Sequence, residues 1–177
     1  ISIIEIGMNK PGEIRNLVKI ARPDIAIITN IGNAHIGNFK SKKYIAIEKS
    51  RIFDFLSKKN IAILPRDDQY FNFLKQAVIK KTSNIYSFGH SHESDFKIFT
   101  NENNLCNFSI LNKIIKLSRS SNSKIWELNI SIILGILELL EITHKISKQS
   151  FKKLEFLEGR GKIQKINISK KTITLID

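Results

Sequence analysis

The sequence predicts an α/β domain with a mostly parallel sheet flanked by helices and a small antiparallel β subdomain. Three observations lead to this fold class. Short apolar runs alternate with segments of helical periodicity in the first half of the chain. The links between them are short and contain Gly, Pro, Asn or Asp. Farther along, short alternating runs are separated by Asn-rich turns, as in antiparallel strands.

The first half is expected to run strand, helix, strand, helix, strand, helix. Each predicted strand is a short apolar run, as in a sheet that is buried on both faces. Each predicted helix repeats apolar residues every three or four positions. The expected strands are residues 1–6, 25–29 and 61–64, and the expected helices are residues 13–21, about 43–58 and 69–80.

The second half is expected to begin with a small, mostly antiparallel sheet within residues 85–117. Its clearest strands are residues 95–100, 106–111 and 114–117. Residues 126–141 are apolar nearly all round, which predicts a buried helix. A second helix is expected at residues 146–157, and a hairpin at residues 163–168 and 172–176.

The composition is that of a globular protein. Hydrophobic residues make up 42% of the 177 residues and charged residues 25%, which excludes a disordered chain. The single cysteine, Cys106, cannot form an intramolecular disulfide, so a reducing compartment is expected. No apolar run reaches the roughly 20 residues that a membrane helix needs, so no membrane insertion is expected. Because the chain starts and stops within strand-like runs, we expect a domain that is incomplete at both ends.

The net charge of +13 has two explanations. A basic chain suits a nucleic-acid partner. The basic residues are mostly Lys, however, are spread along the sequence and accompany many Ile and Asn residues. All three have A/T-rich codons, so a biased base composition also accounts for them. No nucleic-acid partner is expected on this second explanation, whereas clustering of Lys on one face would favour one.

Two candidate metal ligands follow apolar runs. Glu5 lies at the end of the first predicted strand, and His35 lies in the loop after the second. Ligands of open α/β sheets bind at the carboxyl ends of the strands. A carboxylate or a neutral imidazole there can bind a divalent cation. The alternatives are a Glu that reaches solvent and a loop His with an ordinary hydrogen bond.

Lys49 lies on the apolar face of its predicted helix. Its spacing of four from Ile45, three from Ile52 and four from Phe53 directs it inward. A buried ammonium is costly, so Lys49 either extends its amine to solvent or has a chemical role. A lysine in such surroundings can lose its proton and react as a neutral amine.

Other polar residues have two interpretations each. The pair Asp67–Asp68 follows the third strand and either contacts a sugar hydroxyl or caps the next helix. Arg160, between two glycines, is either a phosphate ligand or part of a surface turn. His90 and His92 either bind a metal or lie in a solvated turn, and the polar composition of residues 87–94 favours the turn. His144 is expected at the surface.

Several segments, in order along the chain, resemble the Mur ligase family. The most specific are residues 5–14, reading E-I-G-M-N-K-P-G-E-I, and residues 20–35, reading I-A-R-P-D-I-A-I-I-T-N-I-G-N-A-H. Residues 46–53, 64–68, 157–161 and 174–177 resemble further motifs. Two departures are Ile125–Trp126, where the family usually has His-Asn, and Pro65, where it usually has Asn.

The resemblance implies a cytoplasmic, ATP-dependent amide ligase of peptidoglycan synthesis. It is closest to the member that adds D-alanyl-D-alanine to UDP-N-acetylmuramoyl-tripeptide through an acyl phosphate, with two Mg²⁺ ions on the phosphates of ATP. These two substrates are the implied partners, and a monomer is expected. The alternatives are another Mur-type amino-acid ligase, such as the MurE type, and a basic nucleic-acid-binding module.

The same resemblance implies roles for individual residues. Glu5, His35 and Lys49 would be catalytic metal ligands, with Lys49 carbamylated by CO₂. Asn30, Asp68, Asn129 and Arg160 would contact the nucleotide. Residues 1–176 would form the central ATP-binding domain without its first strand and P-loop, and Asp177 would begin the next domain. No Gly-x-x-x-x-Gly-Lys-Ser/Thr run occurs in the sequence, so the chain alone is expected to be inactive.

Overall fold

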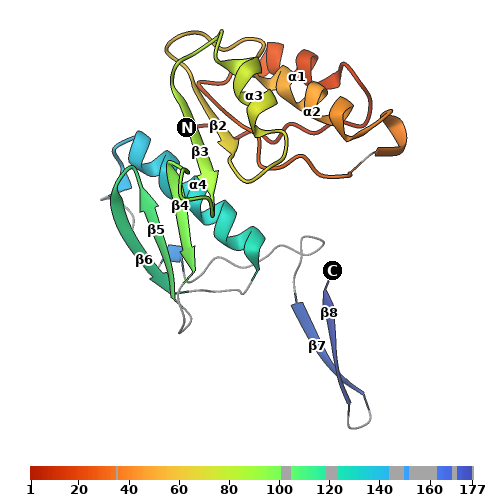
Figure 1. The fold of residues 1–177 in the computed structure, drawn as a ribbon. Helices are drawn as coiled ribbons and strands as arrows, with labels where there is room; N and C mark the ends of the chain where they lie inside the picture. Colours follow the sequence, from red (N-terminus) through yellow and green to blue (C-terminus); the bar gives the residue numbers. More distant parts are fainter. Residues whose placement is uncertain are drawn as a thin grey trace.

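A six-stranded mixed sheet organises the protein (Figure 1). The computed structural model describes residues 1–34, 36–100, 105–118, 123–143, 150–151, 163–168 and 171–176. The strands lie in chain order: β1 (Ile25–Ile27), β2 (Ile61–Pro65), β3 (Ile85–Gly89), β4 (Phe96–Thr100), β5 (Leu105–Ile110) and β6 (Lys113–Ser118). Strands β1 to β4 are parallel, and β4 to β6 are antiparallel. The predicted hairpin is present as β7 (Ile163–Ile168) and β8 (Lys171–Ile176).

Helices cover both faces of the sheet. The long helices are α1 (Glu13–Ala21), α2 (Lys42–Ser50), α3 (Phe71–Val78) and α4 (Lys124–Leu139), and short 3₁₀ turns span Ile36–Asn38 (η1) and Arg51–Phe53 (η2). Helices α1 to α3 share a hydrophobic core with Ala62 and Leu64 of β2. Ile63 faces the other way and joins the core beneath α4. Among the described residues, no helix has both the length and the apolar character needed to cross a bilayer.

Local signals explain where α1 begins and ends. Gly12 precedes the helix with a φ of 92°, a conformation that glycine adopts readily. The Glu13 carboxylate accepts hydrogen bonds from the backbone N–H groups of Asn9 and Lys10. At the other end, Arg22 adopts a left-handed conformation and Pro23 follows, so the helix stops at the predicted residue.

Helix α4 packs closely against β4. The Ser123 side chain accepts a hydrogen bond from the backbone N–H of Ile125 and caps the helix. Gly135 lies against the ring of Phe96, and a Cβ atom at this glycine would come within 2.3 Å of the ring. The helix therefore approaches the sheet at a distance that only glycine permits.

The prediction of a strand at residues 1–6 is wrong. This segment forms no ladder with β1 or with any other described strand. The side chains of Ile1 and Ile3 are 98% and 95% exposed. An apolar run indicates that a segment can be buried, but a strand also needs a backbone partner, which local sequence does not specify.

The antiparallel strands were predicted correctly, but they do not form a sheet of their own. Strand β3 pairs in parallel with β2, and β4 begins beside the end of β3 through the pairs Phe88–Phe96 and Gly89–Lys97. The antiparallel strands therefore extend the parallel part. Of the helix predicted at residues 146–157, only residues 150–151 lie among the described residues, and they are helical.

Candidate functional site

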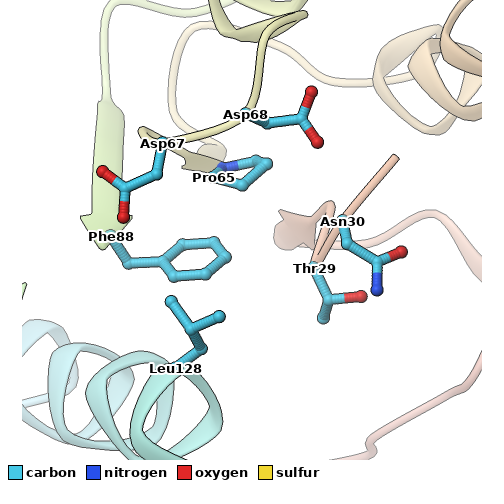
Figure 2. A pocket seen from close by; sticks show the side chains of 7 residues that line it. All are labelled: Thr29, Asn30, Pro65, Asp67, Asp68, Phe88 and Leu128. Atoms are coloured by element: carbon cyan, nitrogen blue, oxygen red, sulfur yellow. The ribbon is translucent and has the colours of Figure 1, made fainter. Parts of the chain in front are cut away.

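A hollow of about 200 Å³ lies at the carboxyl ends of the first three strands (Figure 2). Thr29 and Asn30 follow β1, Pro65 ends β2, and Phe88 lies in β3. Asp67, Asp68 and Leu128 of α4 complete the lining. This is the edge at which open α/β sheets bind ligands. The hollow combines an apolar floor with hydroxyl, amide and carboxylate oxygens.

Asp68 joins the end of β1 to the beginning of α3. Its Oδ2 atom accepts a hydrogen bond from the backbone N–H of Ile31 at 3.1 Å. Its Oδ1 atom accepts one from the backbone N–H of Tyr70 at 2.8 Å, just before α3. The N-cap residue of α3 is Tyr70, whose side chain makes no capping hydrogen bond, so the prediction that Asp67 or Asp68 caps this helix is wrong. The carboxylate points toward the Thr29 and Asn30 side of the hollow (Figure 2).

Asp67 is held by the loop after β3. Its two oxygens accept hydrogen bonds from the backbone N–H groups of His90 (2.6 Å) and Ser91 (2.9 Å). Gly89 precedes them with a φ of 148°, and a Cβ atom there would lie 2.5 Å from Asp67 Oδ2. Asp67 therefore fixes the rim of the hollow through backbone contacts that side-chain patterning in the sequence does not reveal.

Lys49 extends to the loop after β1. Its Nζ atom donates hydrogen bonds to the backbone oxygen of Asn30 at 2.8 Å and to Asn30 Oδ1 at 3.3 Å. Burial lowers the pKa of the Lys49 amine, and the nearby Asp68 carboxylate opposes this effect. The structure therefore brings three predicted site residues, Lys49, Asn30 and Asp68, to one edge of the sheet.

Glu48 is a buried carboxylate that sequence reasoning missed. Its Oε1 atom accepts hydrogen bonds from the backbone N–H groups of Gly12 at 2.8 Å and Ile14 at 3.3 Å. Helix α2 thus contacts the start of α1 through Glu48 and the end of β1 through Lys49. The sequence does contain a signal for the burial of Glu48, because this residue follows the buried Ile45 by three positions and so lies on the same helix face.

Two other predicted site residues that the structure describes, Glu5 and Asn129, do not line the hollow. Glu5 is exposed in the segment that was wrongly predicted as a strand. Asn129 is exposed on α4, next to Leu128. His35 and Arg160 lie outside the described residues, as does His144. Within the part of the chain that the structure describes, no three His, Cys, Asp or Glu side chains group as a metal site.

The solvated turn expected at residues 87–94 is confirmed in part: His90, His92 and Glu93 are exposed in a turn, whereas residues 87–89 belong to β3 and are buried. Ser87 is buried, and both its N–H and its hydroxyl group donate to the Asp95 carboxylate. His90 Nε2 lies 3.6 Å from Oε2 of the buried Glu127 on α4. Asp67 and Glu127, which are far from this loop in the sequence, thus lie against it.

The residues that line the hollow carry some of the groups that bind Mg²⁺ and a nucleotide. Carboxylate, amide and hydroxyl oxygens are ligands that Mg²⁺ accepts, and Asp68, Asn30 and Thr29 supply them. Phe88, Pro65 and Leu128 provide an apolar surface of the kind that binds flat ring systems.

Comparison with known proteins identifies the family. A family model described as the Mur ligase middle domain matches residues 1–133. A UDP-N-acetylmuramoyl-tripeptide–D-alanyl-D-alanine ligase of Rickettsia prowazekii is 35% identical over 175 residues, which are 96% of this chain and 39% of the relative. This chain thus spans about two fifths of that relative's length.

Solved structures support the fold. A crystal structure of MurF from Acinetobacter baumannii aligns with a TM-score of 0.81 and 24% identity, covering 98% of this chain and 38% of that one. A MurF ligase from Thermotoga maritima in complex with ADP aligns with a TM-score of 0.74 and 24% identity, covering 88% of this chain and 36% of that one. With a family model that matches most of its residues, the chain belongs to the Mur ligase middle-domain family.

Proposed function

We propose that this chain is the ATP-binding part of a ligase that joins D-alanyl-D-alanine to UDP-N-acetylmuramoyl-tripeptide in peptidoglycan precursor synthesis. The observation that supports this most strongly is the 35% identity to the Rickettsia ligase over nearly the whole chain. The convergence of Lys49, Asn30 and Asp68 at the carboxyl edge of the sheet agrees with it. In this proposal the protein acts in the cytoplasm.

In this proposal, residues in and near the hollow bind different parts of ATP. Phe88, Pro65 and Leu128 would pack against the base of ATP, with Asn129 reaching its edge from α4. Asn30 and Asp68 would bind polar parts of the nucleotide, and Arg160 would bind a phosphate. ATP would supply the phosphoryl group that activates the substrate carboxylate for attack by the dipeptide amine.

Lys49 would act as a metal ligand after carbamylation. Its lowered pKa makes the neutral amine, the form that adds CO₂, more available at a given pH. The carbamate is an anionic oxygen ligand, which Mg²⁺ prefers. Glu5 and His35 would complete the magnesium ligands, which requires that the segment carrying Glu5 approach the hollow.

The test is phosphate release from ATP by the full-length purified protein. We expect release that requires Mg²⁺, UDP-N-acetylmuramoyl-tripeptide and D-alanyl-D-alanine together. Release that depends on a single amino acid in place of the dipeptide would instead identify another Mur-type ligase. Release that needs neither substrate would contradict the proposal.

A further inference from the structure

Basic residues gather at the amino ends of the parallel strands, at the edge of the sheet opposite the hollow. Residues 19–24, 54–60 and 79–84 directly precede β1, β2 and β3. The hollow lies where the same three strands end. In Figure 1 the segments that lead into β2 and β3 lie away from the arrowheads. We call the surface formed by these three segments the basic edge.

Hydrogen bonds hold the basic edge together. Thr82 Oγ1 donates to the backbone oxygen of Asn60 at 2.7 Å and is 3.3 Å from that of Lys58. Asn84 Nδ2 donates to the same oxygen of Lys58 at 3.1 Å. Asn60 Nδ2 lies 3.4 Å from Asp24 Oδ1. The three segments therefore form one continuous surface.

The charge of the basic edge is strongly positive. Six exposed basic side chains belong to it: Lys19, Arg22, Lys58, Lys59, Lys80 and Lys81. Its acidic residues are Asp24 and Asp54. The Asp54 carboxylate forms ion pairs with two arginines outside the basic edge. Its Oδ2 atom lies 3.2 Å from Arg15 Nε and 3.8 Å from Arg51 Nη1. Little negative charge is therefore left to offset the lysines.

Two exposed isoleucines belong to the same segments as these charges. Ile20 is 83% exposed beside Lys19, and Ile79 is 49% exposed beside Lys80. Aliphatic side chains surrounded by Lys and Arg are typical of surfaces that lie on anionic bilayers. Single-stranded nucleic acid would instead call for exposed aromatic side chains on which bases stack. The only aromatic residue of the three segments, Phe55, is half-buried, with the Arg22 guanidinium 5.8 Å from its ring centroid.

We propose that the basic edge docks the protein onto an anionic phospholipid bilayer. Its lysines and Arg22 would contact lipid headgroups, while Ile20 and Ile79 would enter the interfacial layer. The hollow, at the opposite edge of the sheet, would face away from the membrane and stay open to ligands. This proposal goes beyond the ligase function and does not depend on it.

The test is co-sedimentation of the full-length protein with lipid vesicles. We expect binding to vesicles of equal parts phosphatidylglycerol and phosphatidylcholine, and little binding to phosphatidylcholine alone. Binding should weaken as ionic strength rises from about 0.01 M to about 0.15 M, since the Debye length falls from about 30 Å to about 8 Å. A fourfold variant, Lys58→Glu, Lys59→Glu, Lys80→Glu and Lys81→Glu, should lose roughly tenfold or more in vesicle affinity.

A matched control separates the basic edge from net charge. The variant Lys10→Glu, Lys43→Glu, Lys116→Glu and Lys124→Glu changes the same number of exposed lysines elsewhere. It should retain most of the binding. Ile20→Ser with Ile79→Ser should also weaken binding, whereas Ile114→Ser, at a 69% exposed position on β6, should not. Circular dichroism and thermal unfolding of each variant verify that it is folded.

Three results would overturn the proposal. One is equal binding to neutral and anionic vesicles. Another is equal loss of affinity in the two fourfold variants, which would mean that total charge governs binding. The third is tighter binding to an oligonucleotide than to anionic vesicles, which would assign the surface to nucleic acid. None of these results would affect the substrate-dependent phosphate release that tests the ligase function.

Discussion

At the scale of single residues, Lys49 carries the largest part of the proposed chemistry. Its position on the helix predicted that the side chain points inward. In the structure Lys49 is half-buried, and its amine donates a hydrogen bond to the backbone oxygen of Asn30. Its carbamylation remains a prediction. Desolvation favours the neutral amine, while the Asp68 charge favours the ammonium, and desolvation is the larger effect.

We expect Lys49→Ala to lower turnover by orders of magnitude in the full-length enzyme. Lys49→Arg should not restore activity, because a guanidinium stays charged and cannot form this carbamate. Added acetate should restore part of the activity of Lys49→Ala by supplying a carboxylate. The control is Lys43→Ala, at an exposed position of the same helix. Equal activity of the two alanine variants would show that Lys49 has no catalytic role.

We also expect Gly89→Ala to destabilise the protein by roughly 1–3 kcal/mol. The residue has a φ of 148°, and a Cβ atom would meet the Asp67 carboxylate at 2.5 Å. Urea unfolding measures the change. Gly37→Ala is the matched control, since nothing lies within 4 Å of a Cβ atom there. If both variants unfold at the same urea concentration, Asp67 does not hold the loop as described.

At the scale of elements, periodicity predicted most of the helices and strands. Helix α1 has its predicted bounds, and α3, α4 and the terminal hairpin lie within or close to their predicted ranges, whereas α2 ends at Ser50, before its predicted end near residue 58. The four helices bury a face whose spacing is visible in the sequence. The failures depend on distant partners. The run at residues 1–6 has no neighbouring strand among the described residues, and the part of segment 87–94 that is buried is the end of β3, which pairs with β2 and β4.

The contact between α4 and β4 gives a prediction at this scale. Gly135→Ala would improve helix propensity by about 1 kcal/mol if the helix were exposed. Here the new methyl group would meet the Phe96 ring at 2.3 Å, so we expect a net loss of roughly 1–3 kcal/mol. Thermal or urea unfolding measures it.

A double-mutant cycle identifies the cause. Phe96→Leu removes the ring that the methyl group meets, so Gly135→Ala should be less destabilising in that background. An unchanged effect of Gly135→Ala would mean that the helix is not held against Phe96.

At the scale of the whole molecule, the parallel strands separate two surfaces. Their carboxyl ends carry the hollow with Asp68, Asn30 and Lys49, and their amino ends carry the basic edge. Sequence patterning predicted the first location, because strand ends can be read from apolar runs. It did not predict the second, because lysines that are spread along the sequence come together only when three strands start at one edge.

The composition of the hollow gives a last prediction, that the 177-residue chain by itself does not bind ATP measurably. A triphosphate needs backbone N–H groups or basic side chains around its anionic oxygens. None of the seven residues that line the hollow is basic, and two of them, Asp67 and Asp68, are carboxylates. The sequence also lacks the Gly-x-x-x-x-Gly-Lys-Ser/Thr loop that would cradle the phosphates. Isothermal titration with Mg-ATP should therefore give no heat above dilution, whereas the full-length protein should bind. A micromolar affinity of the chain alone would mean that other residues form the phosphate site.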